Sequence, residues 1–95
     1  MMARDMYYYT KGMSPMPPNP KIALTPFMAM VFTKIRNASR KKCYSTDINF
    51  TLKDSPFQVL TILSILEYKV YLHCENPTTG VMMISWAQDE QIEFN

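Results

Sequence analysis

Apolar residues recur with helical spacing in the middle of the chain. Directly before them, Thr25-Pro26 provides a capping hydroxyl followed by a proline at the first helical position. The spacing predicts an amphipathic helix from about Pro26 to Arg40 or Lys41. The apolar positions that share one side of this helix are Phe27, Val31, Ile35 and Ala38.

A stretch of alternating polarity follows, and after it a second helix signal. Ile48, Phe50 and Leu52 alternate with polar residues, which is the pattern of a half-buried strand from about Thr46 to Leu52. Asp54-Ser55-Pro56 repeats the signal of a cap and a proline, and opens a second helix that we expect to be mostly covered. β-branched residues weaken its helical propensity, so a strand is the alternative. Its apolar positions are Phe57, Val59, Leu60, Ile62, Leu63, Ile65 and Leu66.

Two β-rich runs complete the pattern. They extend from Lys69 to Glu75 and from Val81 to Ala87, and the residues between them include an early proline and a final glycine, as is typical of a hairpin loop. The order is therefore helix, strand, helix, strand, strand. With the helices on one face of a small mixed sheet, this order predicts an α/β (α+β) fold, a two-layer sandwich. A chain of 95 residues has room for one such core.

Residues 1–24 differ in composition from the rest. Four of the seven prolines lie between Pro15 and Pro20, and this density excludes a helix or a central strand there. We expect an extended N-terminal arm over residues 1–24, anchored by three consecutive tyrosines; a disordered tail is the alternative. The small α/β domain then spans residues 25–88, and residues 89–95 form a polar C-terminal tail.

The sequence offers few candidates for catalysis. His73 is the only histidine, and it alternates with apolar residues in a predicted strand, which favours a surface or interface role over that of a catalytic base. Two glycines are too few for the common phosphate-cradling loops. Each acid that could join a catalytic pair has a capping, turn or solvated position. We therefore predict that the protein is not an enzyme and takes no cofactor and no small-molecule substrate.

Cys43 and Cys74 are the only cysteines. Together with one histidine they do not complete the usual four-ligand zinc site, so no metal is expected. No signal peptide is recognisable, so we expect two free thiols in a reducing compartment, with a disulfide between them as the alternative. No apolar run approaches the roughly 20 residues of a membrane helix, and no membrane partner is expected.

Positive charge is concentrated in one segment. The formal net charge is only +2, but no acid interrupts the run that contains Lys34, Arg36, Arg40, Lys41 and Lys42. Arg36 and Arg40 are four residues apart and fall on the polar side of the predicted helix. Such a surface can bind phosphate groups locally. The alternative is that these cations only complement the helix macrodipole.

The residues of this helix form a motif. Thr33-Lys34-Ile35-Arg36-Asn37-Ala38, with Thr25-Pro26-Phe27 before it and Arg40-Lys41-Lys42 after it, resembles the opening helix of bacterial-type small-subunit ribosomal protein eight. In that family Asp-Pro and an apolar stretch lead to Thr-Arg-Ile-Arg-Asn-Ala and a basic turn. The family's N-terminal domain continues in the order strand, helix, strand, strand. The corresponding segments here are Ser55-Pro56-Phe57-Gln58, Ile65-Leu66-Glu67 and Val70-Tyr71-Leu72.

The chain also departs from this family. Thr25 replaces the usual aspartate, and the lysines at the start of the second helix and the glycine at its end are missing. Nothing in the sequence matches the family's second domain, whose Ser-Thr-Ser loop is associated with much of the rRNA contact. The resemblance covers roughly Thr25 to Ala87, and it identifies a reduced or split member.

The resemblance implies a structural constituent of the small ribosomal subunit, which binds rRNA of the central domain and contacts neighbouring ribosomal proteins. The sequence drift, the nine methionines and the N-terminal arm point to a mitochondrial ribosome; otherwise the location is cytoplasmic. The alternatives are a small protein–protein adaptor, for instance a viral inhibitor of a host complex, and a nuclease fragment that has lost its metal histidines. The implied rRNA contacts are Lys34, Arg36, Asn37, Ser39, Arg40, Lys41 and Lys42.

Overall fold

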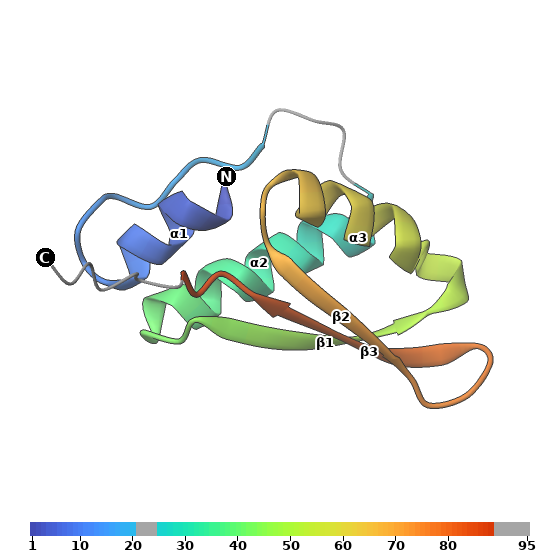
Figure 1. Cartoon of the computed structure of the whole chain (residues 1–95). Coiled ribbons are helices and arrows are strands. Elements are labelled where there is room, and N and C mark those ends of the chain that lie inside the picture. The colour runs from blue at the N-terminus through green and yellow to red at the C-terminus, as the bar shows by residue number, and fades with distance from the viewer. Residues whose placement is uncertain (21–24, 89–95) are drawn as a thin grey trace, which may run out of the picture.

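The structure, a computed structural model of the chain, describes residues 1–20 and 25–88. An additional N-terminal helix precedes the order helix, strand, helix, strand, strand (Figure 1). A single 3-10 turn over Leu52–Asp54 joins the first strand to the third helix. The elements are α1 (Ala3–Thr10), α2 (Pro26–Arg40), β1 (Ser45–Thr51), α3 (Pro56–Ile65), β2 (Lys69–Cys74) and β3 (Thr79–Ser85).

The three strands form one sheet in the order β1-β3-β2, and both pairings are antiparallel. The α+β class and the order helix, strand, helix, strand, strand after residue 25 are confirmed. The predicted mixed sheet is wrong, because β3 lies between β1 and β2, which run parallel to each other, and pairs antiparallel with both. The helices of the described residues all lie on one side of the sheet, and none of these elements covers its other face (Figure 1).

Helix α2 begins where the sequence predicts. The Thr25 hydroxyl accepts a hydrogen bond from the Met28 backbone N–H at 3.2 Å, which satisfies one of the unpaired donors of the first turn. Phe27, Val31 and Ile35 are buried against the sheet side of the helix. The predicted apolar stripe is therefore the one that enters the core.

Close packing in the sheet depends on Gly80 in the central strand. Gly80 pairs with Phe50 of β1 on one side and with Cys74 of β2 on the other. A Cβ atom at this position would overlap the His73 carbonyl oxygen and lie 2.8 Å from the Phe50 ring. The missing side chain lets the phenyl ring lie over the backbone of β3.

Helix α3 is more exposed than expected. It is helical, as predicted, but only Pro56, Val59 and Leu63 are buried, whereas Phe57 is 65% exposed and Ile65 is 71% exposed. The expectation of a mostly covered helix is therefore wrong. A sheet of three strands is narrow, and α2 occupies part of its covered face, so α3 contacts the core through a single stripe.

The predicted extended arm is wrong over Ala3–Thr10, which form helix α1. Its buried residues are Ala3, Met6, Tyr7 and Thr10, spaced as one side of a helix. The proline run begins only at Pro15, and residues 15–20 have no helix or strand. The rest of the predicted arm, residues 21–24, and the predicted tail, residues 89–95, lie outside the described residues.

Trp86, just after β3, attaches α1 to the rest of the core. Its side chain is fully buried, and its indole N–H donates to the Thr10 hydroxyl oxygen at 3.0 Å. That hydroxyl donates in turn to the Met6 carbonyl at 2.7 Å. At the other end of α1, the Ala3 N–H donates to the Leu66 carbonyl at 2.8 Å. The helix is thus fixed at both ends.

Tyr68 packs beside this anchor. Its ring meets the Trp86 indole edge to face, with the ring centroids 6.4 Å apart. Burial, with a smaller contribution from the Asp5 carboxylate, raises the pKa of the Tyr68 phenol far above its ordinary value. The phenol therefore stays neutral at physiological pH, and its aromatic body contributes to the core.

Replacing Thr10 with valine tests the anchor. Thr10→Val keeps the size of the side chain but leaves the buried Trp86 N–H without its acceptor. We expect the free energy of unfolding, measured by urea denaturation, to fall by about 1–3 kcal/mol. Thr61→Val is the matched control, because the Thr61 hydroxyl makes the same local bond, to the Phe57 carbonyl at 2.9 Å, at an exposed position. Equal losses in the two variants would contradict the role of the Trp86–Thr10 bond.

Candidate nucleic-acid interface

The predicted contact residues lie along the C-terminal half of α2 and the turn that follows it. Lys34, Arg40, Lys41 and Lys42 are exposed, and Arg36 is half-buried. No ion pair joins any of these five cations to an acid within residues 1–20 and 25–88. Their charge is therefore not compensated by a fixed partner in the described structure. We call these five residues the cationic surface.

Two residues of the predicted set restrain each other. The Arg40 guanidinium donates to the Asn37 side-chain oxygen at 3.1 Å, one helical turn away. This bond uses the acceptor of the Asn37 amide and leaves its NH2 group directed to other partners. It also orients the planar guanidinium, whose remaining donors can bind a phosphate in a bidentate manner.

Arg36 lies on the opposite flank of α2 from Lys34. Its Nε atom is buried and has no hydrogen-bond partner in the part of the chain that the structure describes. A buried donor without an acceptor costs free energy. Arg36 therefore carries this cost in the described conformation, while the rest of its half-buried side chain remains in part accessible to solvent.

Ser39 does not belong to this surface. The prediction that it contacts RNA is wrong, because its side chain is buried and its hydroxyl donates to the Ile35 carbonyl at 2.8 Å. The signal was present in the sequence. Ser39 follows Ile35 by four residues and Val31 by eight, so helical periodicity puts it on the core side.

Lys42 occupies an unusual backbone position. Its φ of 66° is left-handed, and it ends α2 in a motif in which its N–H donates to the Ser39 carbonyl while the Cys43 N–H reaches the Ala38 carbonyl. Glycine is the usual residue at this position because a Cβ atom is strained there. A lysine in this strained conformation is consistent with a functional role for its positive charge.

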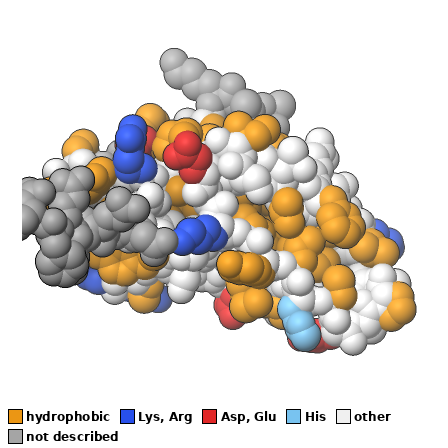
Figure 2. All heavy atoms as spheres, in the orientation of Figure 1, with side chains coloured by type: hydrophobic (Ala, Val, Ile, Leu, Met, Phe, Trp, Pro, Cys, Tyr) orange, Lys and Arg blue, Asp and Glu red, His pale blue; other side chains and the backbone are white. Residues whose placement is uncertain are grey.

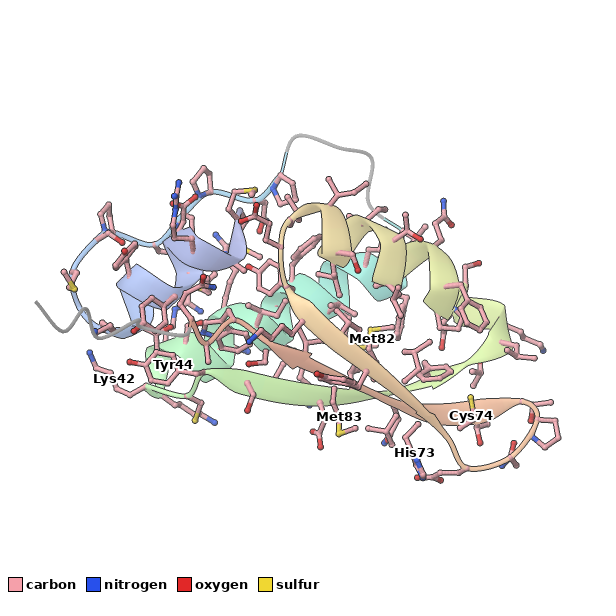
Figure 3. All side chains as sticks on the ribbon, viewed as in Figure 1. Lys42, Tyr44, His73, Cys74, Met82 and Met83 are labelled. Carbon is pink, nitrogen blue, oxygen red and sulfur yellow. The ribbon has the colours of Figure 1, made fainter. Side chains whose placement is uncertain are left out.

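The N-terminal segment extends the cationic surface. A Cβ atom placed on Gly12 would lie 3.7 Å from the Lys42 ammonium nitrogen, so the end of α1 lies against that lysine. Lys11 has its ammonium 5.2 Å from the centre of the Tyr7 ring, and Tyr7 packs on Tyr44 with ring centroids 5.5 Å apart. Figure 3 shows Lys42 and Tyr44 beside α1. The sequence pattern does not predict Lys11 as part of this surface, because it does not predict α1.

A shallow open groove of about 800 Å³ runs from α2 around the β1 edge to the uncovered face of the sheet. The residues on that face come from alternate positions of the strands, and Met82 and Met83 point to opposite faces (Figure 3). None of the sheet residues in the groove was predicted as a contact. Lys34, Asn37 and Lys41 line the groove from α2 and its C-terminal cap, and the sheet contributes Asp47, Tyr71 and Met83.

The remaining candidates for chemistry are the single histidine and the two cysteines of the sequence. His73 is exposed on the uncovered face of the sheet (Figure 3), and Cys43 and Cys74 are exposed free thiols. Across residues 1–20 and 25–88 there is no group of three His, Cys, Asp or Glu side chains that could hold a metal ion. In the same ranges, every helix is too short or too polar to cross a membrane.

Comparison with known proteins identifies no relative: no family model, no curated protein and no solved structure matches the chain.

Replacing Lys42 with glycine tests whether its position is strained. Lys42→Gly removes the left-handed penalty, and we expect the free energy of unfolding to rise by up to about 1 kcal/mol. Lys41→Gly is the control: it removes the same charge one residue earlier, where φ is −88° and glycine brings no relief. Thermal and urea unfolding should show the gain in the first variant only. A loss of stability in Lys42→Gly would show that the side chain itself stabilises the turn.

Proposed function

We propose that this protein is a structural constituent of a small ribosomal subunit, in a mitochondrial ribosome, and that it binds rRNA through the cationic surface. The observation that carries the proposal is the set of five cations at one end of α2, which has no ion pair with an acid of the described residues. Uncompensated cations on a rigid helix suit the phosphate backbone, which dominates affinity for nucleic acids.

The architecture supports the proposal further. The resemblance to small-subunit ribosomal protein eight implies the order helix, strand, helix, strand, strand, and α2, β1, α3, β2 and β3 follow in that order. Within the motif, the apolar residue faces the core and polar residues face solvent, as an RNA-binding helix requires. Ile35 is buried, whereas Lys34 and Asn37 are exposed. In this proposal Arg36 and Arg40 bind phosphates, and the Asn37 NH2 group donates to a sugar or a loop backbone.

The proposal is tested by removing charge from the cationic surface. Arg40→Gln with Lys42→Gln removes two exposed cations but keeps a side chain at the left-handed position. If each cation binds one phosphate, the slope of log K against log salt for small-subunit rRNA should become shallower by about 0.7–0.9 per lost contact. The double variant should also sediment less with small subunits in a gradient.

Arg4→Gln with Lys53→Gln is the matched control, because it removes one arginine and one lysine at exposed positions outside the cationic surface. We expect it to leave binding and its salt dependence nearly unchanged. Adding Arg36→Gln and Lys41→Gln to the first double variant should abolish rRNA association. If association survives in this fourfold variant, the proposed RNA contacts are wrong.

A second candidate function, that of a protein–protein adaptor, is favoured by one observation. Helix α3 contains no charged residue, yet it exposes Phe57 and Ile65. Hydrophobic side chains gather over α3 and the adjoining strand in Figure 2, and exposed apolar patches of this kind mark protein interfaces. An adaptor would sediment with its target protein, and substituting Phe57 and Ile65 with serine would release it; a ribosomal constituent sediments with the small subunit.

A further inference from the structure

The groove between α2 and the sheet joins two lysines of the cationic surface to an exposed apolar patch on the sheet, which the proposed rRNA contacts do not explain. Lys34 and Lys41 line it from α2, and both are exposed. They are seven residues apart, two turns of the helix, so their Cα atoms lie about 10 Å apart along the axis. The wall of the groove can therefore hold two separated anionic groups.

The floor of the groove is a row of side chains across all three strands. Asp47 on β1 pairs with Met83 on β3, and Met83 pairs with Tyr71 on β2. Tyr71 is 64% exposed and Met83 is 44% exposed. Side chains paired across antiparallel strands are about 5 Å apart, so the phenol ring and the thioether form one continuous apolar patch next to the Asp47 carboxylate.

We propose that this groove binds an unpaired nucleotide of single-stranded RNA, with its base stacked on Tyr71 beside Met83 and its flanking phosphates at Lys34 and Lys41. The proposal rests on the proposed function in one respect, that the ligand is RNA. A flat aromatic ring next to cations is the usual platform for single-stranded nucleic acid. A paired base would not reach the ring, because its faces are covered in a duplex.

Asp47 determines which base fits. A carboxylate repels phosphate, but it accepts two hydrogen bonds from adjacent N–H donors. Guanine presents such a pair, N1–H and the N2 amino group, on its Watson–Crick edge, whereas uracil presents one donor between two acceptors. Asn37 adds a donor from α2, because its oxygen already accepts from Arg40. The groove should therefore prefer guanine over uracil.

The stack is tested with octamers of RNA, one of uridines only and one with a single central guanosine, and with a duplex of the same length. Tyr71→Leu should weaken binding of the guanosine octamer by about tenfold, as measured by fluorescence anisotropy, and leave duplex binding unchanged. Phe57→Leu is the matched control, because Phe57 is exposed to the same degree, 65%, on α3. Tyr71→Phe keeps the ring and should keep the affinity.

Two further variants test the proposed contact of Asp47 with guanine and the proposed contacts of Lys34 and Lys41 with phosphates. Asp47→Asn offers one acceptor in place of two, and it should reduce the preference for the guanosine octamer over the uridine octamer. Lys34→Gln with Lys41→Gln should make the salt slope for the octamers shallower by about 1.4. With a photoreactive 5-bromouridine beside the guanosine, the cross-linked peptide should contain Tyr71 or Met83.

The outcomes separate this inference from the proposed function. If Tyr71→Leu binds the octamers as the unaltered chain does while Arg40→Gln with Lys42→Gln still weakens rRNA binding, the groove inference is wrong and the proposed function stands. If Tyr71→Leu weakens octamer binding but the unaltered chain never sediments with small subunits, the groove inference stands and the ribosomal role is wrong. If the chain binds neither RNA, both are overturned.

Discussion

The position of the N-terminal helix depends on the indole N–H of Trp86. The Trp86 side chain is fully buried just after the central strand, and the acceptor of its N–H is Thr10, 76 residues earlier in the chain. A buried donor without a partner is costly, so α1 has to lie where the Thr10 hydroxyl can accept. That position also brings the turn at Gly12 next to Lys42. One hydrogen bond thus links the hydrophobic core to the cationic surface.

Much of the fold could be predicted because its signals are local. Thr25 and Pro26 mark the start of α2, and the alternation around Ile48 and Phe50 marks β1. Helix α1 could not be predicted in this way. It has eight residues and no side-chain cap at its start, so it would be marginal in isolation. Its stability comes from contacts with Trp86 and Leu66, which no pattern within residues 1–24 reveals.

The same distinction between local signals and tertiary contacts applies to the candidate site. The cations of the cationic surface are clustered in one segment of the sequence, from Lys34 to Lys42, so a charge pattern finds them. Ser39 is among the predicted RNA contacts because it lies within the basic segment. Its helical spacing of four residues from Ile35, however, places it in the core. The groove could not be predicted, because Tyr71, Met83 and Asp47 come from three strands. Only the order β1-β3-β2 and its register put them in one row.

The narrowness of the sheet explains why a chain of this size has two different surfaces. Three strands covered on one side leave the other side bare, and α3 contacts the core through one stripe only. The bare side adjoins the cations of α2, whereas the exposed part of α3 is uncharged and lies toward the other end of the molecule from Lys42 (Figures 1 and 3). A polyanion would gain nothing from α3, and an apolar protein partner would have to desolvate the lysines of α2. The two surfaces therefore suit different partners, and a ribosome, in which a small protein contacts both RNA and other proteins, offers both.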